Sequence, residues 1–251
     1  MRAALVTGGA KRIGRALVER LAREGFAVAI HCNASRTDAE GLADAIEREG
    51  GRAGVVVGDL ADGGAVGGLL RAASERLGQP IDLLVNNASV FEPDGIADLD
   101  RTAFERTLAI NLTAPLVLAR DLAAGLPEDA EGLVVNILDQ RVWKETPAFF
   151  SYQISKSALF TATRTMAQAL APRVRVCAIG PGPTLVGPRQ HPEDFARQSA
   201  SVPLRHGGTP DEIADALLYL IGARSVTGQM IAVDGGQHLA WETPDVTQSG
   251  E

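Results

Sequence analysis

The fold of this chain is decided by the stretch Val6-Thr7-Gly8-Gly9-Ala10-Lys11-Arg12-Ile13-Gly14, near the start of 251 residues. It joins an apolar run at 3–6 to a segment at 12–24 whose apolar residues recur at helical spacing. Glycines in a strand-to-helix turn let the backbone turn tightly and approach a pyrophosphate, which the helix N-terminus stabilises. The motif has Arg12 where a further glycine often stands, and a glycine-rich turn without a ligand is the alternative interpretation.

Short apolar runs alternate with longer amphipathic stretches along the rest of the chain. We expect strands at 3–6, 27–31, 55–58, 81–86, 133–138, 174–179 and 230–233, and helices at 12–24, 38–49, 69–77, 104–122, 149–170 and 211–221. Strands separated by crossover helices pair in parallel, with helices on both faces. The prediction is an α/β chain, a single doubly wound domain over 1–251 with a surface loop at 181–205, expected to be the substrate loop, and a polar tail at 237–251.

Composition narrows the class of protein. The chain is 45% hydrophobic and 22% charged, and 24 Lys+Arg against 31 Asp+Glu leave a net charge of −7, which opposes binding to nucleic acid. We find no apolar run near the ~18 residues of a membrane span and no secretion signal. Cys32 and Cys177 have neither a disulfide framework nor metal-ligand spacing. We therefore expect a cytoplasmic protein with no metal, no membrane and no nucleic-acid partner.

The end of the second predicted strand bears on the choice of dinucleotide. A site for NAD usually has an acidic residue there to hold the ribose 2′-hydroxyl, but this chain has none before Asp38. Asn33, Ser35 and Arg36 suit a 2′-phosphate instead, because they offer an amide, a hydroxyl and a guanidinium. NADP(H) is therefore the expected cofactor, with NAD(H) less favoured. The alternative is that Arg36 is a solvated residue at a helix start.

Polar residues follow two more strands at the same edge of the predicted sheet. Asp59 and Leu60 follow the third strand, where the Asp could accept from an adenine amino group or cap a helix. Asn87, Ala88 and Ser89 follow the fourth, where turn chemistry is the alternative. Ligands of open α/β sheets bind at the carboxyl ends of the strands, which favours a cofactor site.

A Tyr–Lys pair is the sharpest catalytic signal. Tyr152 and Lys156 are spaced i, i+4 and share one face of a helix, while Asp139 stands thirteen residues earlier at the end of a strand. We expect the ammonium group to lower the pKa of the phenol from ~10 and prepare it as a proton donor. On spacing alone the favoured interpretation is an exposed Tyr and Lys on a surface helix, because Tyr-x-x-x-Lys is a loose pattern.

Together these residues resemble the short-chain dehydrogenase/reductase family over residues 3–236. The resemblance also rests on Asn111, Pro181-Gly182 and the ending Thr227-Gly228-Gln229…Asp234-Gly235-Gly236. It implies a Rossmann fold, hydride transfer with NAD(P), Tyr152 as acid/base and Lys156 on the nicotinamide ribose. It further implies that Asn111 orders a proton-relay water, that Pro181, Gly182 and Thr184 lie at the nicotinamide, and that the chain forms a homotetramer.

One departure is informative. Members that act on alcohols and ketones usually have Ser at the position of Asp139, because a hydroxyl donates to the substrate oxygen. An Asp makes better sense where a ring nitrogen gains a proton as hydride reaches the adjoining carbon. In this the chain is similar to pteridine reductases and dihydromonapterin reductases, which implies that Phe91 stacks on a pterin, that Arg12 reaches both cofactor phosphate and pterin, and that Ser89 contacts the cofactor.

Several alternatives remain at this point. Phe91 could be a core residue, and Trp143, Phe149 and Phe150 could line the pocket or a subunit contact. The leading hypothesis is an NADPH-dependent reductase of a C=N bond in a pterin-like small molecule. Its rivals are a ketone or 3-oxoacyl reductase of the same fold and a non-catalytic NADP(H)-binding sensor.

Overall fold

The centre of the protein is one parallel β-sheet. The structure is a computed structural model that describes residues 2–187 and 189–242. Seven strands pair in the order β3-β2-β1-β4-β5-β6-β7, and every pairing is parallel. The strands are β1 (Ala3–Val6), β2 (Ala27–Cys32), β3 (Arg52–Val57), β4 (Leu83–Asn86), β5 (Gly132–Ile137), β6 (Val174–Pro181) and β7 (Met230–Val233). The predicted doubly wound α/β fold is thus confirmed.

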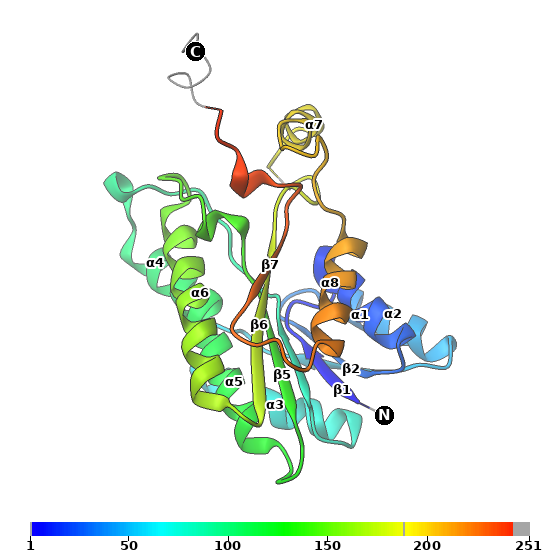
Figure 1. Ribbon diagram of the computed structural model, residues 1–251. Helices are drawn as coiled ribbons and strands as arrows, with labels where there is room; N and C mark the ends of the chain where they lie inside the picture. The colour runs from blue at the N-terminus through cyan, green and yellow to red at the C-terminus, as the bar shows by residue number, and fades with distance from the viewer. Residues whose placement is uncertain (1, 188, 243–251) are drawn as a thin grey trace.

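Helices cover both faces of the sheet (Figure 1). One face carries α1 (Arg12–Arg23), α2 (Arg36–Arg48) and α8 (Pro210–Gly222); the other carries α3 (Gly63–Leu77), α4 (Arg101–Leu108), α5 (Ala114–Gly125) and α6 (Phe150–Leu170). Leu17 of α1 and Leu118 of α5 are fully buried in the cores on the two faces. Each such burial contributes roughly 1.5–3 kcal/mol. The central strands are almost entirely apolar, with Asn86 and Asn136 as buried exceptions, because both of their sides face helices.

The loop after β6 contains a helix that the sequence analysis missed. Residues 192–200 form α7 (Pro192–Ala200), within the segment expected to be a surface loop at 181–205. Pro192 stands in its first turn, where proline is tolerated, and Glu193 and Asp194 complement the helix dipole there. These residues are signals of a helix start, but the sequence analysis interpreted the prolines only as marking a loop. Of the expected tail, residues 243–251 lie outside the described part of the chain.

The predicted helix at 104–122 is in fact three consecutive elements. A π-helical segment, Ala109–Thr113, separates α4 from α5 and widens the helix locally. Segments of this type frequently occur at functional sites. This one contains Asn111, which the sequence analysis placed at the catalytic centre.

The helical segment Arg101–Gly125 meets the length and hydropathy criteria of a membrane span, with a mean hydropathy of 1.2. The expectation that no apolar run approaches that length is not overturned, because charged residues such as Arg106 and Arg120 interrupt the segment. The criteria use length and composition only, and core helices of soluble proteins also meet them. Of the apolar window, 39% is buried within the described structure, including Leu118 and Leu122 against the sheet.

The strand order reverses beside β1, and this positions the site. β1 is flanked by β2 on one side and β4 on the other, so the connections after β1 and β4 leave the sheet in opposite directions. A crevice forms at such a point, outside the carboxyl ends of the strands. The glycine-rich turn follows β1 there, and Asn87 follows β4.

Candidate active site

The glycine-rich turn brings backbone segments into close contact at two glycines. Gly8 has a positive φ of 60°, and a Cβ on Gly14 would lie 2.2 Å from the Gly8 carbonyl oxygen, so a side chain cannot fit there. Helix α1 begins at Arg12, and its N-cap residue Lys11 makes no side-chain capping bond. The first N–H groups of α1 are therefore left for an anion.

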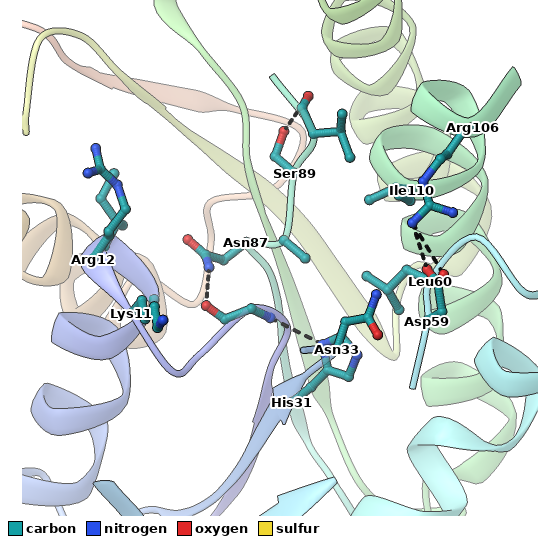
Figure 2. A pocket seen from close by; sticks show the side chains of 15 residues that line it. Lys11, Arg12, His31, Asn33, Asp59, Leu60, Asn87, Ser89, Arg106 and Ile110 are labelled. Atoms are coloured by element: carbon teal, nitrogen blue, oxygen red, sulfur yellow. Dashed lines mark hydrogen bonds and ion pairs between the residues drawn. The ribbon is translucent and has the colours of Figure 1, made fainter. Parts of the chain in front are cut away.

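The turn is tied to the segment that follows β4. Thr7 Oγ1 accepts from the backbone N–H groups of Asn87 at 2.9 Å and Ala88 at 3.0 Å. The Asn87 amide donates to the carbonyl oxygens of Thr7 at 2.9 Å and Gly8 at 3.1 Å (Figure 2). Asn87 thus holds the two loops together, in agreement with the turn chemistry that the sequence offered as an alternative.

A cavity of about 440 Å³ opens at this edge of the sheet. Ten residues expected to bind the cofactor line it, namely Gly8, Arg12, Ile13, Gly14, Asn33, Asp59, Leu60, Asn87, Ala88 and Ser89. Its lining does not include the expected Ser35, Arg36, Pro181, Gly182 and Thr184. The sequence analysis missed Lys11, His31, Val90, Arg106 and Ile110 (Figure 2).

His31 is a buried imidazole that joins the ends of three strands. Its Nδ1 lies 3.2 Å from the backbone N–H of Gly8, which must donate, so Nε2 carries the ring proton and donates to Gly58 O at 3.0 Å. Burial lowers the pKa of His31, which keeps the ring neutral. His31 lies within β2 and is the last residue of the strand predicted at 27–31, but its spacing alone gave no sign that it reaches the glycine-rich turn.

The basic residues at the cavity differ from the expectation. Arg36 is exposed, begins α2 and pairs with Glu40 at 2.8 Å, outside the cavity lining. Lys11 lines the cavity and pairs with Asp38 at 3.0 Å at its rim. The structure therefore places the ammonium group of Lys11, rather than the guanidinium of Arg36, at the cavity.

Asp59 is held by two donors beside the cavity. The N–H of Ala61 donates to its carboxylate at 2.9 Å, and the Arg106 guanidinium lies 3.2 Å away. These contacts, the Ala61 bond first, lower the pKa of Asp59, so it remains an acceptor. The N-cap of α3 is Asp62, which removes the alternative role considered for Asp59.

The side chains of Tyr152, Asp139 and Lys156, which the sequence analysis expected to be catalytic, lie close together. The Tyr152 hydroxyl donates to Asp139 Oδ2 at 2.9 Å, and the Lys156 ammonium nitrogen lies 5.6 Å from the centre of the Tyr152 ring. Lys156 donates to Ile137 O at 2.8 Å. Tyr152 and Lys156 are buried, so they are not exposed surface residues.

The pKa values of Tyr152, Asp139 and Lys156 correct one expectation. The pKa of Tyr152 is raised well above its usual value, first by burial and then by Asp139, and is not lowered by Lys156. Burial also raises the pKa of Asp139, and burial lowers the pKa of Lys156 to about 8. Burial thus shifts all three groups toward their neutral forms, although Lys156, with a pKa of about 8, is still mostly protonated at neutral pH.

Asn111 connects the segment after β4 to helix α6. Its amide nitrogen donates to Val90 O at 2.9 Å and to Ser155 Oγ at 3.0 Å, and its oxygen accepts from the Val90 N–H at 2.8 Å. Ser89 Oγ lies 3.3 Å from the same oxygen. The described partners of Asn111 are thus protein groups beside the site.

An aromatic cluster lies next to Tyr152. Phe91 stacks on Phe149, with ring centres 4.1 Å apart and planes 8° apart, and meets Tyr152 edge-on at 4.6 Å. The Arg141 guanidinium lies over both phenylalanine rings, at 5.3 and 5.4 Å. Phe91 is 39% exposed, so it is not a core residue.

Trp143 belongs to a different group. Its ring contacts Phe160 at 6.1 Å and His238 at 5.0 Å, and no ring contact joins it to the Phe91 cluster among the described residues. The structure therefore does not bring Trp143 together with Phe91 and Tyr152.

The loop after β6 reaches across to both sides of the site. Arg12 donates to Val186 O at 2.9 Å and Leu185 O at 3.3 Å, so its guanidinium holds this loop. Arg189 donates to Phe91 O at 2.5 Å and to Glu92 at 2.6 Å. Thr184 donates to Gly182 O at 3.0 Å within the loop. The segment thus spans from the glycine-rich turn to the aromatic cluster that contains Phe91.

Comparison with known proteins agrees with this geometry. A family model described as enoyl-(acyl carrier protein) reductase matches residues 8–238. The chain is 31% identical over 242 residues to 2-(S)-hydroxypropyl-CoM dehydrogenase 3 of Xanthobacter autotrophicus, covering 92% of this chain and 94% of that protein.

Two solved structures are also similar. FolM alternative dihydrofolate reductase 1 from Brucella suis, in complex with NADP, is 56% identical with a TM-score of 0.95, over 97% of this chain and 98% of that one. A blue fluorescent protein from a metagenomic library, in complex with NADPH, is 33% identical with a TM-score of 0.86, over 94% and 97%.

Proposed function

The chain belongs to the short-chain dehydrogenase/reductase family, and on that premise we propose that it reduces a C=N bond in a pterin-like heterocycle with NADPH. It is an oxidoreductase of this family, and NADP(H) is its cofactor, since two similar solved structures hold NADP or NADPH. The similar Brucella protein is called an alternative dihydrofolate reductase, a name that supports a reduced or oxidised pterin as the substrate class.

The cavity residues fit a dinucleotide. The missing Cβ at Gly14 and the uncapped start of α1 leave room and N–H donors for a pyrophosphate. Lys11, whose ammonium group pairs with Asp38, is a positively charged residue of the cavity lining and suits a 2′-phosphate. Asp59, kept ionised by its donors, suits an adenine amino group. When bound, NADPH supplies the hydride that the reduction needs.

Side chains of the protein hold the proton and transfer it to the substrate. Tyr152 keeps its proton at neutral pH because its pKa is raised, and it lies within hydrogen-bond distance of Asp139. Asp139, whose pKa is also raised, can bind a proton and become a donor toward a ring nitrogen. Lys156, when charged, stabilises the negative charge that develops on Tyr152 as it gives up its proton.

The observation that carries the proposal is the contact between Tyr152 and Asp139. A ketone becomes an alkoxide, which an ionised carboxylate would repel, whereas a ring nitrogen gains a proton and can be held by a carboxylate afterwards. Asp139 accepts the Tyr152 hydroxyl at 2.9 Å, so it stands at the reacting end of the phenol. Phe91 is 39% exposed and meets Tyr152 edge-on; because Phe149 stacks on one face of its ring, a flat heterocycle would stack on the opposite face.

Steady-state assays test the proposal directly. The purified enzyme would be given a dihydropterin or a panel of small ketones, each with NADPH and with NADH. We expect the highest kcat/KM for the dihydropterin with NADPH, and loss of turnover in Tyr152→Phe. Preferential reduction of a ketone would favour the carbonyl reductase alternative, and tight NADPH binding without turnover on any substrate would favour the sensor.

A further inference from the structure

Helix α6, which carries Tyr152, begins without a cap of its own. It starts at Phe150, and the residue before it is Phe149, whose side chain cannot accept a hydrogen bond. Phe149 also has a positive φ of 58°, a conformation that is unfavourable for a bulky residue. The first turn contains no acidic residue. The N–H groups that start this helix therefore need an acceptor from elsewhere.

Asp94 supplies that acceptor from a segment 57 positions away in sequence. Its carboxylate oxygens lie 3.1 and 3.2 Å from the N–H of Ser151, and the Ser151 hydroxyl donates to the same group. The backbone oxygen of Asp94 also accepts from the Phe150 N–H at 3.3 Å. Ser151 is buried and directly precedes Tyr152, so the contact lies one residue from the proton donor.

The Asp94 segment also carries the aromatic wall of the site. Phe91, three residues before Asp94, stacks on Phe149 and meets Tyr152 edge-on. The segment at 91–94 and the start of α6 are thus joined by ring contacts at one end and by hydrogen bonds at the other. These two sets of contacts fix the distance between the wall and the phenol.

We infer that Asp94 is a positioning residue that caps α6 from outside and fixes Tyr152 relative to Phe91. A negative charge at a helix N-terminus stabilises the helix through the helix dipole. The hydrogen bonds to Asp94 also fix where the first turn of α6 lies. A misplacement of about 1 Å at the reacting groups lowers the rate by about a hundredfold. The catalytic consequence rests on the proposed function; the capping of α6 does not.

The test compares Asp94→Ala with Asp94→Asn, Ser151→Ala and Asp98→Ala in the full chain. Asp98 is the matched control, since its carboxylate accepts from Gly95 N–H at 2.9 Å in the same loop and caps only the local turn. Hydrogen exchange of the peptide at 149–156, kcat, KM and the Kd for NADPH would be measured for each variant.

In Asp94→Ala we expect exchange in this peptide to be at least about tenfold faster and kcat to fall by about ten- to a hundredfold. The Kd for NADPH should stay within about twofold, because the glycine-rich turn is untouched. Asp94→Asn should recover part of kcat through its remaining acceptor oxygen, Ser151→Ala should have a smaller effect, and Asp98→Ala should match the wild type.

Two outcomes would overturn the inference: unchanged exchange at 149–156 in Asp94→Ala, or faster exchange with unchanged kcat. A wild-type enzyme that reduces a ketone and not a dihydropterin would count against the proposed substrate only, and kcat on the ketone would then decide the role of Asp94. If the wild type reduces neither, the exchange result alone decides whether Asp94 positions the helix.

Discussion

The hydroxyl of Tyr152 lies 2.9 Å from Asp139 Oδ2, and the two groups influence each other's protonation. The pKa of Tyr152 is raised by burial and by the nearby carboxylate, and burial raises the pKa of Asp139 as well. The phenol therefore stays protonated through the neutral range, and the pair holds its protons more firmly than either group would in water.

Replacing Asp139 by Ser tests the role of the carboxyl group. We expect kcat for a dihydropterin to fall by about 10²–10⁴-fold, the range for a lost general acid. NADPH binding should be retained, because Asp139 is not part of the cavity lining. Single-turnover rates and the Kd for NADPH would be measured, with Tyr152→Phe as the reference for full loss of proton transfer. Unchanged turnover in Asp139→Ser would remove the argument for a C=N substrate.

The activity should depend on pH through Lys156. Burial lowers its pKa to about 8, so the ammonium group loses its proton as the pH rises through 8 in the free enzyme. The positive charge that stabilises developing phenolate at Tyr152 is then lost, and kcat/KM for reduction should fall above about pH 8. This fall would be measured in a profile of kcat/KM between about pH 6 and 10, in steps of about one pH unit. The residual activity of Lys156→Arg should lack this fall, because arginine stays charged; a parallel fall would assign the titration to another group.

Cofactor affinity should weaken in acid because of His31. Its pKa is lowered by burial, and the neutral ring accepts from the Gly8 N–H through Nδ1. Protonation fills that acceptor and sets a buried charge beside the glycine-rich turn, so the Kd for NADPH should rise in acid, at a pH below the range in which an ordinary imidazole titrates, because the pKa of His31 is lowered. In His31→Gln, whose amide can accept from Gly8 and donate to Gly58 without titrating, the Kd should be flat between pH 5 and 8. An equal rise of the Kd in acid in both proteins would contradict this role of His31.

Lys11 should determine the preference for NADPH over NADH. It lines the cavity, whereas Arg36 pairs with Glu40 outside it. A hydrogen bond to a charged group contributes about 1.5–3 kcal/mol, so Lys11→Ala should lower kcat/KM for NADPH by at least about tenfold and leave NADH nearly unchanged. Arg36→Ala serves as the matched control and should change the ratio by less than about threefold. A larger effect of Arg36→Ala would return the role to Arg36, as the sequence first suggested.

The secondary structure was predictable because its signals are local. The strand at 3–6 and the strand at 230–233 were found with the correct bounds, since apolar runs between turn residues mark buried strands. The helix at 192–200 was missed because its proline at the first turn was read as a loop signal. The π-helical segment around Asn111 could not be found, since nothing in a helical pattern marks one widened turn.

The amino-acid sequence by itself determined the doubly wound sheet, the glycine-rich turn at its carboxyl edge and the meeting of Tyr152 with Lys156, because all three depend on short-range spacing. Only the tertiary structure decided that Tyr152 holds its proton more firmly, that His31 supports the turn at Gly8 and that Asp94 caps the catalytic helix. Those properties arise from burial and from contacts between residues far apart along the chain, and no local pattern contains either.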